Sequence, residues 1–162
     1  PTFIQKAAET YGNQCIVVSI DAKKKPDGTH EVYIDRGRKA TGEKVEEWAR
    51  RIESMQAGEI FLTSIDNDGG RKGYDQNLIR KVNDVVSIPV IASGGVGKWE
   101  HLIDALENGA DAVSAANIFH YMEHSTKLAK EYMVQSGIDA RKPFFFQLET
   151  PRNPTYNVQG YI

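Results

Sequence analysis

Short apolar runs rich in β-branched residues alternate with helical patterns along most of the chain, and this alternation strongly constrains the fold. The apolar runs are at residues 15–20, 59–64, 90–92 and 111–114. Apolar side chains three and four positions apart predict helices at residues 2–11, 43–55, 76–85, 98–108 and 125–136. Strands that alternate with such helices pair in parallel through right-handed crossovers. The sequence therefore predicts an α/β fold in which one helix precedes four strand-helix units.

One segment interrupts this alternation. Residues 23–28 contain lysines followed by Pro26-Asp27-Gly28, which is typical of a turn, and residues 31–34 alternate as a strand does. We expect a small hairpin here, followed by a polar loop at residues 36–42.

Composition excludes several classes of partner. With 162 residues the chain has the length of one domain, and its hydrophobic (40%) and charged (26%) fractions are ordinary for a globular protein. The formal net charge of −2 does not indicate binding to nucleic acid or to an anionic membrane. No apolar run is long enough to span a bilayer. Cys15, the single cysteine, lies in a predicted strand, where we expect a packed thiol. A lone cysteine predicts a reducing, cytoplasmic location.

Small and polar residues follow each predicted strand. Asp21 follows the first, and the others are followed by residues 65–70, by Ser93-Gly94-Gly95 and by Ala115-Ala116-Asn117. The carboxyl ends of parallel strands form the functional face of an α/β sheet. Glycines between a strand and a helix let backbone N–H groups approach an anion closely. This face is therefore predicted to bind a phosphate.

Several motifs resemble, in the correct order, the cyclase subunit of imidazole glycerol phosphate synthase. They are Ile20-Asp21-Ala22-Lys23, Leu62-Thr63-Ser64-Ile65-Asp66 with Asp68-Gly69 and Gly73-Tyr74-Asp75, Ile91-Ala92-Ser93-Gly94-Gly95, and Gly109-Ala110-Asp111-Ala112 with Ala115-Ala116 and Phe119-His120. A paralogous group of cyclase-like proteins, associated with surface-polysaccharide gene clusters, shares these motifs. The related isomerase of histidine synthesis fits less well around residues 20–23 and 63–66.

The resemblance implies a (β/α)8 TIM-barrel type fold, of which residues 1–141 match the second half: four parallel strand-helix units preceded by a helix. Residues 142–162 form a C-terminal extension that the family lacks. The chain is thus expected to be either a fragment of a longer protein or a half-barrel that pairs with a missing N-terminal half or with a second copy. A hypothesis for the extension is that it shields surface which the other half would cover.

The resemblance also implies an activity. The family closes an imidazole ring from a phosphoribulosyl aminoimidazole intermediate, with ammonia supplied by a glutaminase subunit, and it needs no cofactor. Asp21 matches an aspartate that acts in general acid/base catalysis, because the reaction moves several protons. Ser64, Asp68, Gly69, Ser93, Gly94, Gly95, Ala116 and Asn117 match residues at the bound phosphorylated substrate, although many relatives have Ser or Gly in place of Asn117.

Other interpretations remain open at this stage. The chain is either such an enzyme, a non-catalytic half-barrel module that binds phosphate or assists assembly, or a cyclase-like amidotransferase partner in surface-polysaccharide biosynthesis. Asp66 and Asp68 either face the site or bond to amides of their own loop. His120 and His124 are four residues apart, but no third ligand is evident, so we expect no metal.

Overall fold

The computed structural model describes residues 2–120 and 125–142. Its elements in chain order are α1 (Thr2–Tyr11), η1 (Asn13–Cys15), β1 (Val17–Lys24), β2 (His30–Ile34), β3 (Lys39–Lys44), α2 (Val45–Ser54), β4 (Glu59–Ser64), α3 (Gln76–Asn83), β5 (Val90–Ser93), α4 (Glu100–Glu107), β6 (Ala112–Ser114), η2 (Asn117–His120) and α5 (Ser125–Gln135). The proposed extension at residues 143–162 lies outside the described residues. In the described part of the chain, no helix is long and apolar enough to cross a membrane.

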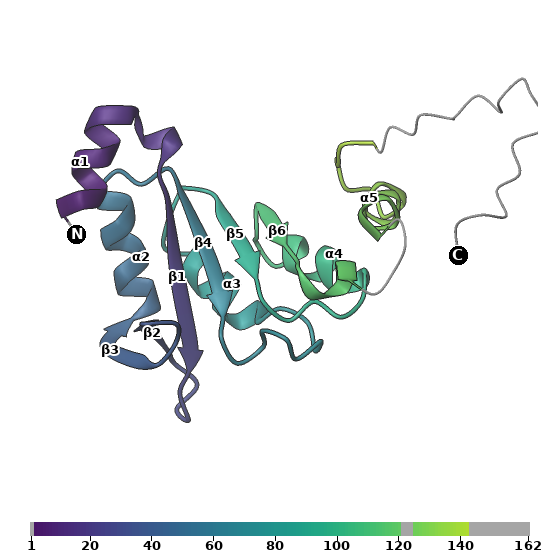
Figure 1. Cartoon of the computed structure of the whole chain (residues 1–162), viewed down its shortest axis with the longest axis horizontal. Helices are drawn as coiled ribbons and strands as arrows, with labels where there is room; N and C mark the ends of the chain where they lie inside the picture. The colour runs from purple at the N-terminus through teal and green to yellow at the C-terminus, as the bar shows by residue number, and fades with distance from the viewer. Residues whose placement is uncertain (1, 121–124, 143–162) are drawn as a thin grey trace, which may run out of the picture.

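The strands form a six-stranded sheet in the order β3-β2-β1-β4-β5-β6 (Figure 1). β1, β4, β5 and β6 pair in parallel, whereas β2 and β3 form an antiparallel hairpin on the outer side of β1. This arrangement confirms the predicted α/β class, with one helix followed by four strand-helix units, and it is consistent with part of a (β/α)8 barrel.

The core lies on one face of the sheet. Side chains alternate between the two faces of a strand, and Ile20, Leu62 and Ala92 on one face are at most 1% exposed. Apolar residues of α2 and α3, such as Ile52 and Leu78, pack in the same layer. The helices therefore cover this face.

The opposite face of the sheet is less buried. It carries Val17, which is 51% exposed, together with the half-buried Phe61 and Ile91. Within the described residues, no strand pairs with the outer edge of β6 or with the outer side of β1 at residues 17–20. The parallel part of the sheet thus has two open edges and one face without a helical cover.

Three predictions for the first strands were wrong. Cys15 is exposed and ends the η1 turn, so it is not a packed thiol within a strand. β1 begins two residues later and extends past Asp21 to Lys24, because β2 pairs with residues 21–24. The segment predicted as a polar loop contains the exposed strand β3, which is held by pairing with β2.

Candidate functional site

Four polar side chains form one row across the parallel strands. Asp21 of β1 is in register with Thr63 of β4, Thr63 with Ser93 of β5, and Ser93 with Ser114 of β6. Their neighbours Ile20, Leu62 and Ala92 are in the core, so the row lies on the face without helices. With strands about 4.8 Å apart, the row spans roughly 14 Å. We call these four residues the polar row.

The hairpin encloses the Asp21 end of the polar row. Tyr33 of β2 lies opposite Asp21 in the antiparallel pair, and the Lys23 Nζ is 5.5 Å from the centre of the Tyr33 ring. A cavity of about 270 Å³ opens beside this end of the row. It is lined by Asp21, Arg36, Gly37, Thr63, Ile65 and Asp68.

The structure places the predicted site residues at the end of β4 on different sides of the sheet. Asp68 lines the cavity with Asp21, and Gly69 follows it in the same exposed loop. Ser64 instead points into the helix-covered layer, is 3% exposed, and lies near Tyr74 and Leu78. The alternation of the strand explains this, because Ser64 shares a face with the core residue Leu62, whereas Thr63 does not.

Asp66 holds two loops together. One of its carboxylate oxygens accepts a hydrogen bond from the Lys24 backbone N–H at 2.7 Å. It therefore ties the loop after β4 to the end of β1 rather than bonding within its own loop. The amide of Asp68 donates to the Ser64 carbonyl at 3.0 Å, which fixes the position of the Asp68 backbone.

Gly94 and Gly95 are buried and have positive φ angles of 91° and 107°. The Gly73 N–H donates to the Gly95 carbonyl at 2.8 Å, and a Cβ atom on Gly95 would lie 2.1 Å from the Gly73 carbonyl oxygen. Both glycines are thus required by the close approach of the loop after β4. The space beside each glycine is therefore filled by backbone carbonyl groups of the chain itself, Ser64 for Gly94 and Gly73 for Gly95.

The last two residues predicted to bind the substrate, Ala116 and Asn117, follow β6. Asn117 begins the short turn η2, and Ala116 precedes it and is exposed. The preceding residue in the polar row, Ser114, is held by the Tyr74 hydroxyl, which donates to its carbonyl at 2.8 Å. Burial raises the pKa of Tyr74 above its ordinary value, so this hydroxyl keeps its proton.

A contact between a buried histidine and a partly buried aspartate fastens the hairpin to the rest of the domain. His30 of β2 is 1% exposed, and its Nε2 lies 3.0 Å from a carboxylate oxygen of Asp75. The other oxygen of Asp75 caps α3 by accepting from the Leu78 N–H at 2.9 Å. Burial raises the pKa of Asp75, but the hydrogen bonds from His30 and Leu78 outweigh it, and the net pKa lies below its ordinary value.

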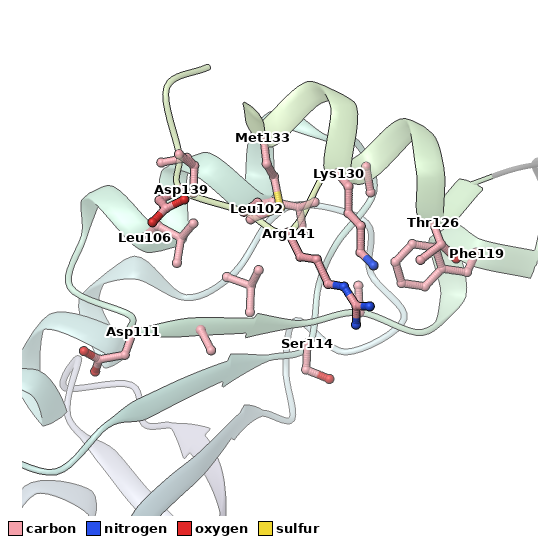
Figure 2. Close-up of a pocket in the computed structure, with 16 residues that line it drawn as sticks. Leu102, Leu106, Asp111, Ser114, Phe119, Thr126, Lys130, Met133, Asp139 and Arg141 are labelled. Carbon is pink, nitrogen blue, oxygen red and sulfur yellow. The ribbon is translucent and has the colours of Figure 1, made fainter. Parts of the chain in front are cut away.

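A larger groove of about 550 Å³ lies at the opposite edge of the sheet, between β6, α4 and α5. Its wall is mainly apolar, with Leu102, Val113 and Met133. Figure 2 shows the side chains of Lys130 and Arg141 pointing into it. Asp21 does not line this groove, so the larger groove is separate from the candidate acid/base residue.

Sequence reasoning did not single out Thr63, Ser114, Tyr33 or Arg36. Strand alternation places Thr63 and Ser114 on the face opposite the core once the core residues are known. The sequence pattern could therefore have indicated these two residues. Tyr33 and Arg36 reach the site through the hairpin, whose pairing fixes their position. Among the described residues, no three His, Cys, Asp or Glu side chains gather to hold a metal ion, and His124 lies outside these residues.

A protein-family model described as "Histidine biosynthesis protein" matches residues 1–125. The match covers every strand of the sheet, the hairpin and the whole polar row. It also covers all residues singled out from the sequence as catalytic or substrate-binding.

Proposed function

This chain belongs to the histidine biosynthesis protein family, and we propose that within it the chain performs the cyclase-type reaction of imidazole glycerol phosphate synthase. A phosphoribulosyl aminoimidazole intermediate would react with ammonia from a glutaminase subunit, and the imidazole ring would close as another bond is cleaved. The observation that carries the proposal is the polar row, in which Asp21 is in register with Thr63 and Ser93 beside Gly94 and Gly95.

Residues of the polar row and of the loops beside it have distinct roles in this chemistry. Asp21 is the general acid/base, because ring closure requires protons to be taken from nitrogen and returned to a leaving group. The hydroxyl groups of Thr63 and Ser93 hold the hydroxyls of the sugar chain, since a hydroxyl both donates and accepts. The backbone of Gly94 and Gly95, with Ala116 and Asn117 after the next strand, receives the phosphate. Asp68 borders the same site and Gly69 follows it in the loop, while Ser64 supports the end of β4 from the core side.

Activity also requires the sheet to be completed. Open parallel strands expose unpaired N–H and C=O groups, and a closed barrel of this type has eight strands. Residues 1–141 supply four parallel strands, and we assign the other four to a second copy or to an N-terminal half-barrel. Mass measurement in solution distinguishes a pair of chains from a single chain.

An ammonia-dependent cyclase assay with the full chain and with Asp21→Asn tests the function. Removing the acid/base carboxylate should lower kcat by about 10²- to 10⁴-fold. Ser19→Ala is the matched control, because Ser19 is exposed, lies on the same face of β1 and is two residues away. It should leave kcat unchanged.

Two outcomes contradict the proposal. One is a lack of turnover by the wild-type chain with excess ammonium, a glutaminase partner and an added half-barrel. The other is equal activity in Asp21→Asn and Ser19→Ala. Phosphate binding without any turnover would favour the non-catalytic module instead.

A further inference from the structure

The groove of about 550 Å³ beside β6 presents an apolar wall. Leu106 of α4, Val113 of β6 and Met133 of α5 contribute to this wall. α5 is held in its place at the groove, because Ala129 is 4% exposed and belongs to the same core cluster as Leu102. An apolar surface of this extent favours an apolar occupant.

Two cations give this groove a positively charged end. Figure 2 shows Lys130 and Arg141 pointing into the groove, whereas Asp111 and Asp139 lie away from them. Within the described part of the chain, no hydrogen bond or ion pair holds the side chain of either cation. The groove is therefore suited to an apolar segment that carries a carboxylate near one end.

The end of α5 brings the chain to this groove. Gly137 follows the helix with a φ of +83°, and its N–H donates to the Val134 carbonyl at 3.1 Å. The Ile138 N–H donates to the Met133 carbonyl at 3.0 Å, and the two bonds form a Schellman motif that ends the helix. Residues 138–141 then line the groove. The residues that follow them therefore leave the described structure beside the groove.

The next stretch of sequence has the composition that this groove requires. Three consecutive phenylalanines occupy positions 144–146, and Leu148 and Glu149 follow shortly after them. The chain from Arg141 to Phe144 can span about 10 Å at most, so the aromatic run begins close to the groove. These residues lie outside the described part of the structure and outside the family match, which ends at residue 125.

We propose that residues 144–149 of this chain occupy the groove. The phenyl rings pack against its apolar wall, since each buried aromatic side chain removes about 150–250 Å² from water. The Glu149 carboxylate pairs with Lys130 and Arg141, which gives the segment one direction in the groove. The proposal does not depend on the proposed function, because Asp21 does not line this groove.

Photo-cross-linking of the full chain tests where this segment lies. A p-benzoylphenylalanine in place of Phe145 bonds to a nearby C–H group on irradiation, and mass spectrometry of the digested protein identifies the partner peptide. We expect cross-links within one chain, to peptides that contain Leu106 or Met133. The same photoreactive residue in place of Phe3 is the control, because Phe3 is 80% exposed and does not line the groove. It should not label these peptides.

Blocking the groove should reduce the cross-link. Leu106→Lys places a charge on the apolar wall and should lower the cross-link yield by about fivefold or more. Leu128→Lys is the matched control and should leave the yield unchanged, because Leu128 is an exposed leucine of α5 that does not line the groove. Lys130→Glu tests the charged end and should lower the yield by about two- to fivefold. Combining it with Glu149→Lys should restore the yield.

Three results would overturn the proposal. Cross-links between two chains would show that a second copy fills the groove, and cross-links spread over peptides away from the groove would show that the segment has no defined binding place. Equal yields in Leu106→Lys and Leu128→Lys are the third. If circular dichroism shows that Leu106→Lys is unfolded, the charge reversal decides instead, and an unchanged yield in Lys130→Glu overturns the proposal.

Discussion

The imidazole Nε2 of His30 and a carboxylate oxygen of Asp75 lie 3.0 Å apart, although 45 positions separate the two residues in the sequence. His30 is on the hairpin and Asp75 begins α3. The contact therefore connects the segment that carries Tyr33 and Arg36 to the layer of helices.

Removing the Asp75 side chain should destabilise the domain. Asp75→Ala deletes the cap of α3, which is worth about 1 kcal/mol, and leaves the buried His30 without its partner, which costs about 1–3 kcal/mol. We expect a loss of about 2–4 kcal/mol in the free energy of unfolding, measured with denaturant. Asp84→Ala at the other end of α3 is the control, because Asp84 is exposed and should change stability by less than about 0.5 kcal/mol. A similar loss in both variants would argue against a special role for the pair.

The same carboxylate should make stability depend on pH. The pKa of Asp75 is lower in the folded chain than in the unfolded chain, so the unfolded chain binds the proton at a higher pH. This contribution to stability is fully present above the unfolded pKa of about 3.9 and is lost as the pH falls through the folded pKa. Asp75→Asn cannot titrate, so it should lose less stability than the wild type between about pH 5 and pH 3. Unfolding curves measured across this range test the sign, and parallel curves for the two proteins would refute it.

The hydrogen bond between Tyr74 and Ser114 should have a measurable effect of its own. Tyr74 is 6% exposed, and its hydroxyl donates to the Ser114 carbonyl at 2.8 Å. Tyr74→Phe keeps the ring but removes the donor, and it should lower the free energy of unfolding by about 1 kcal/mol. Tyr132→Phe in α5 is the matched control and should have almost no effect. An unchanged stability of Tyr74→Phe would show that water replaces the hydroxyl at no cost.

Alanine substitutions should affect two of the site glycines differently. Gly69 has a φ of +71° with open space around it, so Gly69→Ala incurs only the backbone cost of about 1–2 kcal/mol. Gly95→Ala incurs a similar cost and also places a Cβ atom 2.1 Å from the Gly73 carbonyl oxygen. Thermal unfolding should therefore show a lower midpoint for Gly95→Ala than for Gly69→Ala. Equal midpoints would mean that the two loops separate easily.

The order of the strands and helices could be predicted because their periodicity is strong. Residues 59–64 form β4 within the predicted bounds, and the helices differ from prediction by a few residues at their ends. The start of β1 was less predictable because contacts distant in sequence determine it. The Gly58 N–H donates to the Ile16 carbonyl, and a Cβ atom on Gly58 would lie 2.3 Å from the Asn13 carbonyl oxygen. This close packing accompanies the η1 turn that places Cys15 outside the strand.

The site could be predicted as a set of strand ends but not as a geometry. Asp21 and Asp68 do line one cavity, as their positions after adjacent strands suggest. Ser64 and Thr63 are adjacent in the sequence, and the alternation of β4 shows which of them faces the cavity only once Leu62 is known to be in the core. Arg36 lies in a segment predicted as a loop, and its place beside Asp21 arises from the pairing of β2 with both β1 and β3.

The hairpin also determines how the sheet can grow. β2 occupies the outer side of β1 from Asp21 to Lys24, whereas residues 17–20 have no partner on that side within the described part of the chain. Any strand that joins this edge must therefore stop before Asp21. The hairpin therefore limits how far an incoming strand can extend along this edge of β1. A sheet completed in this way would keep the carboxylate of Asp21 at the rim, whichever chain supplies the strand.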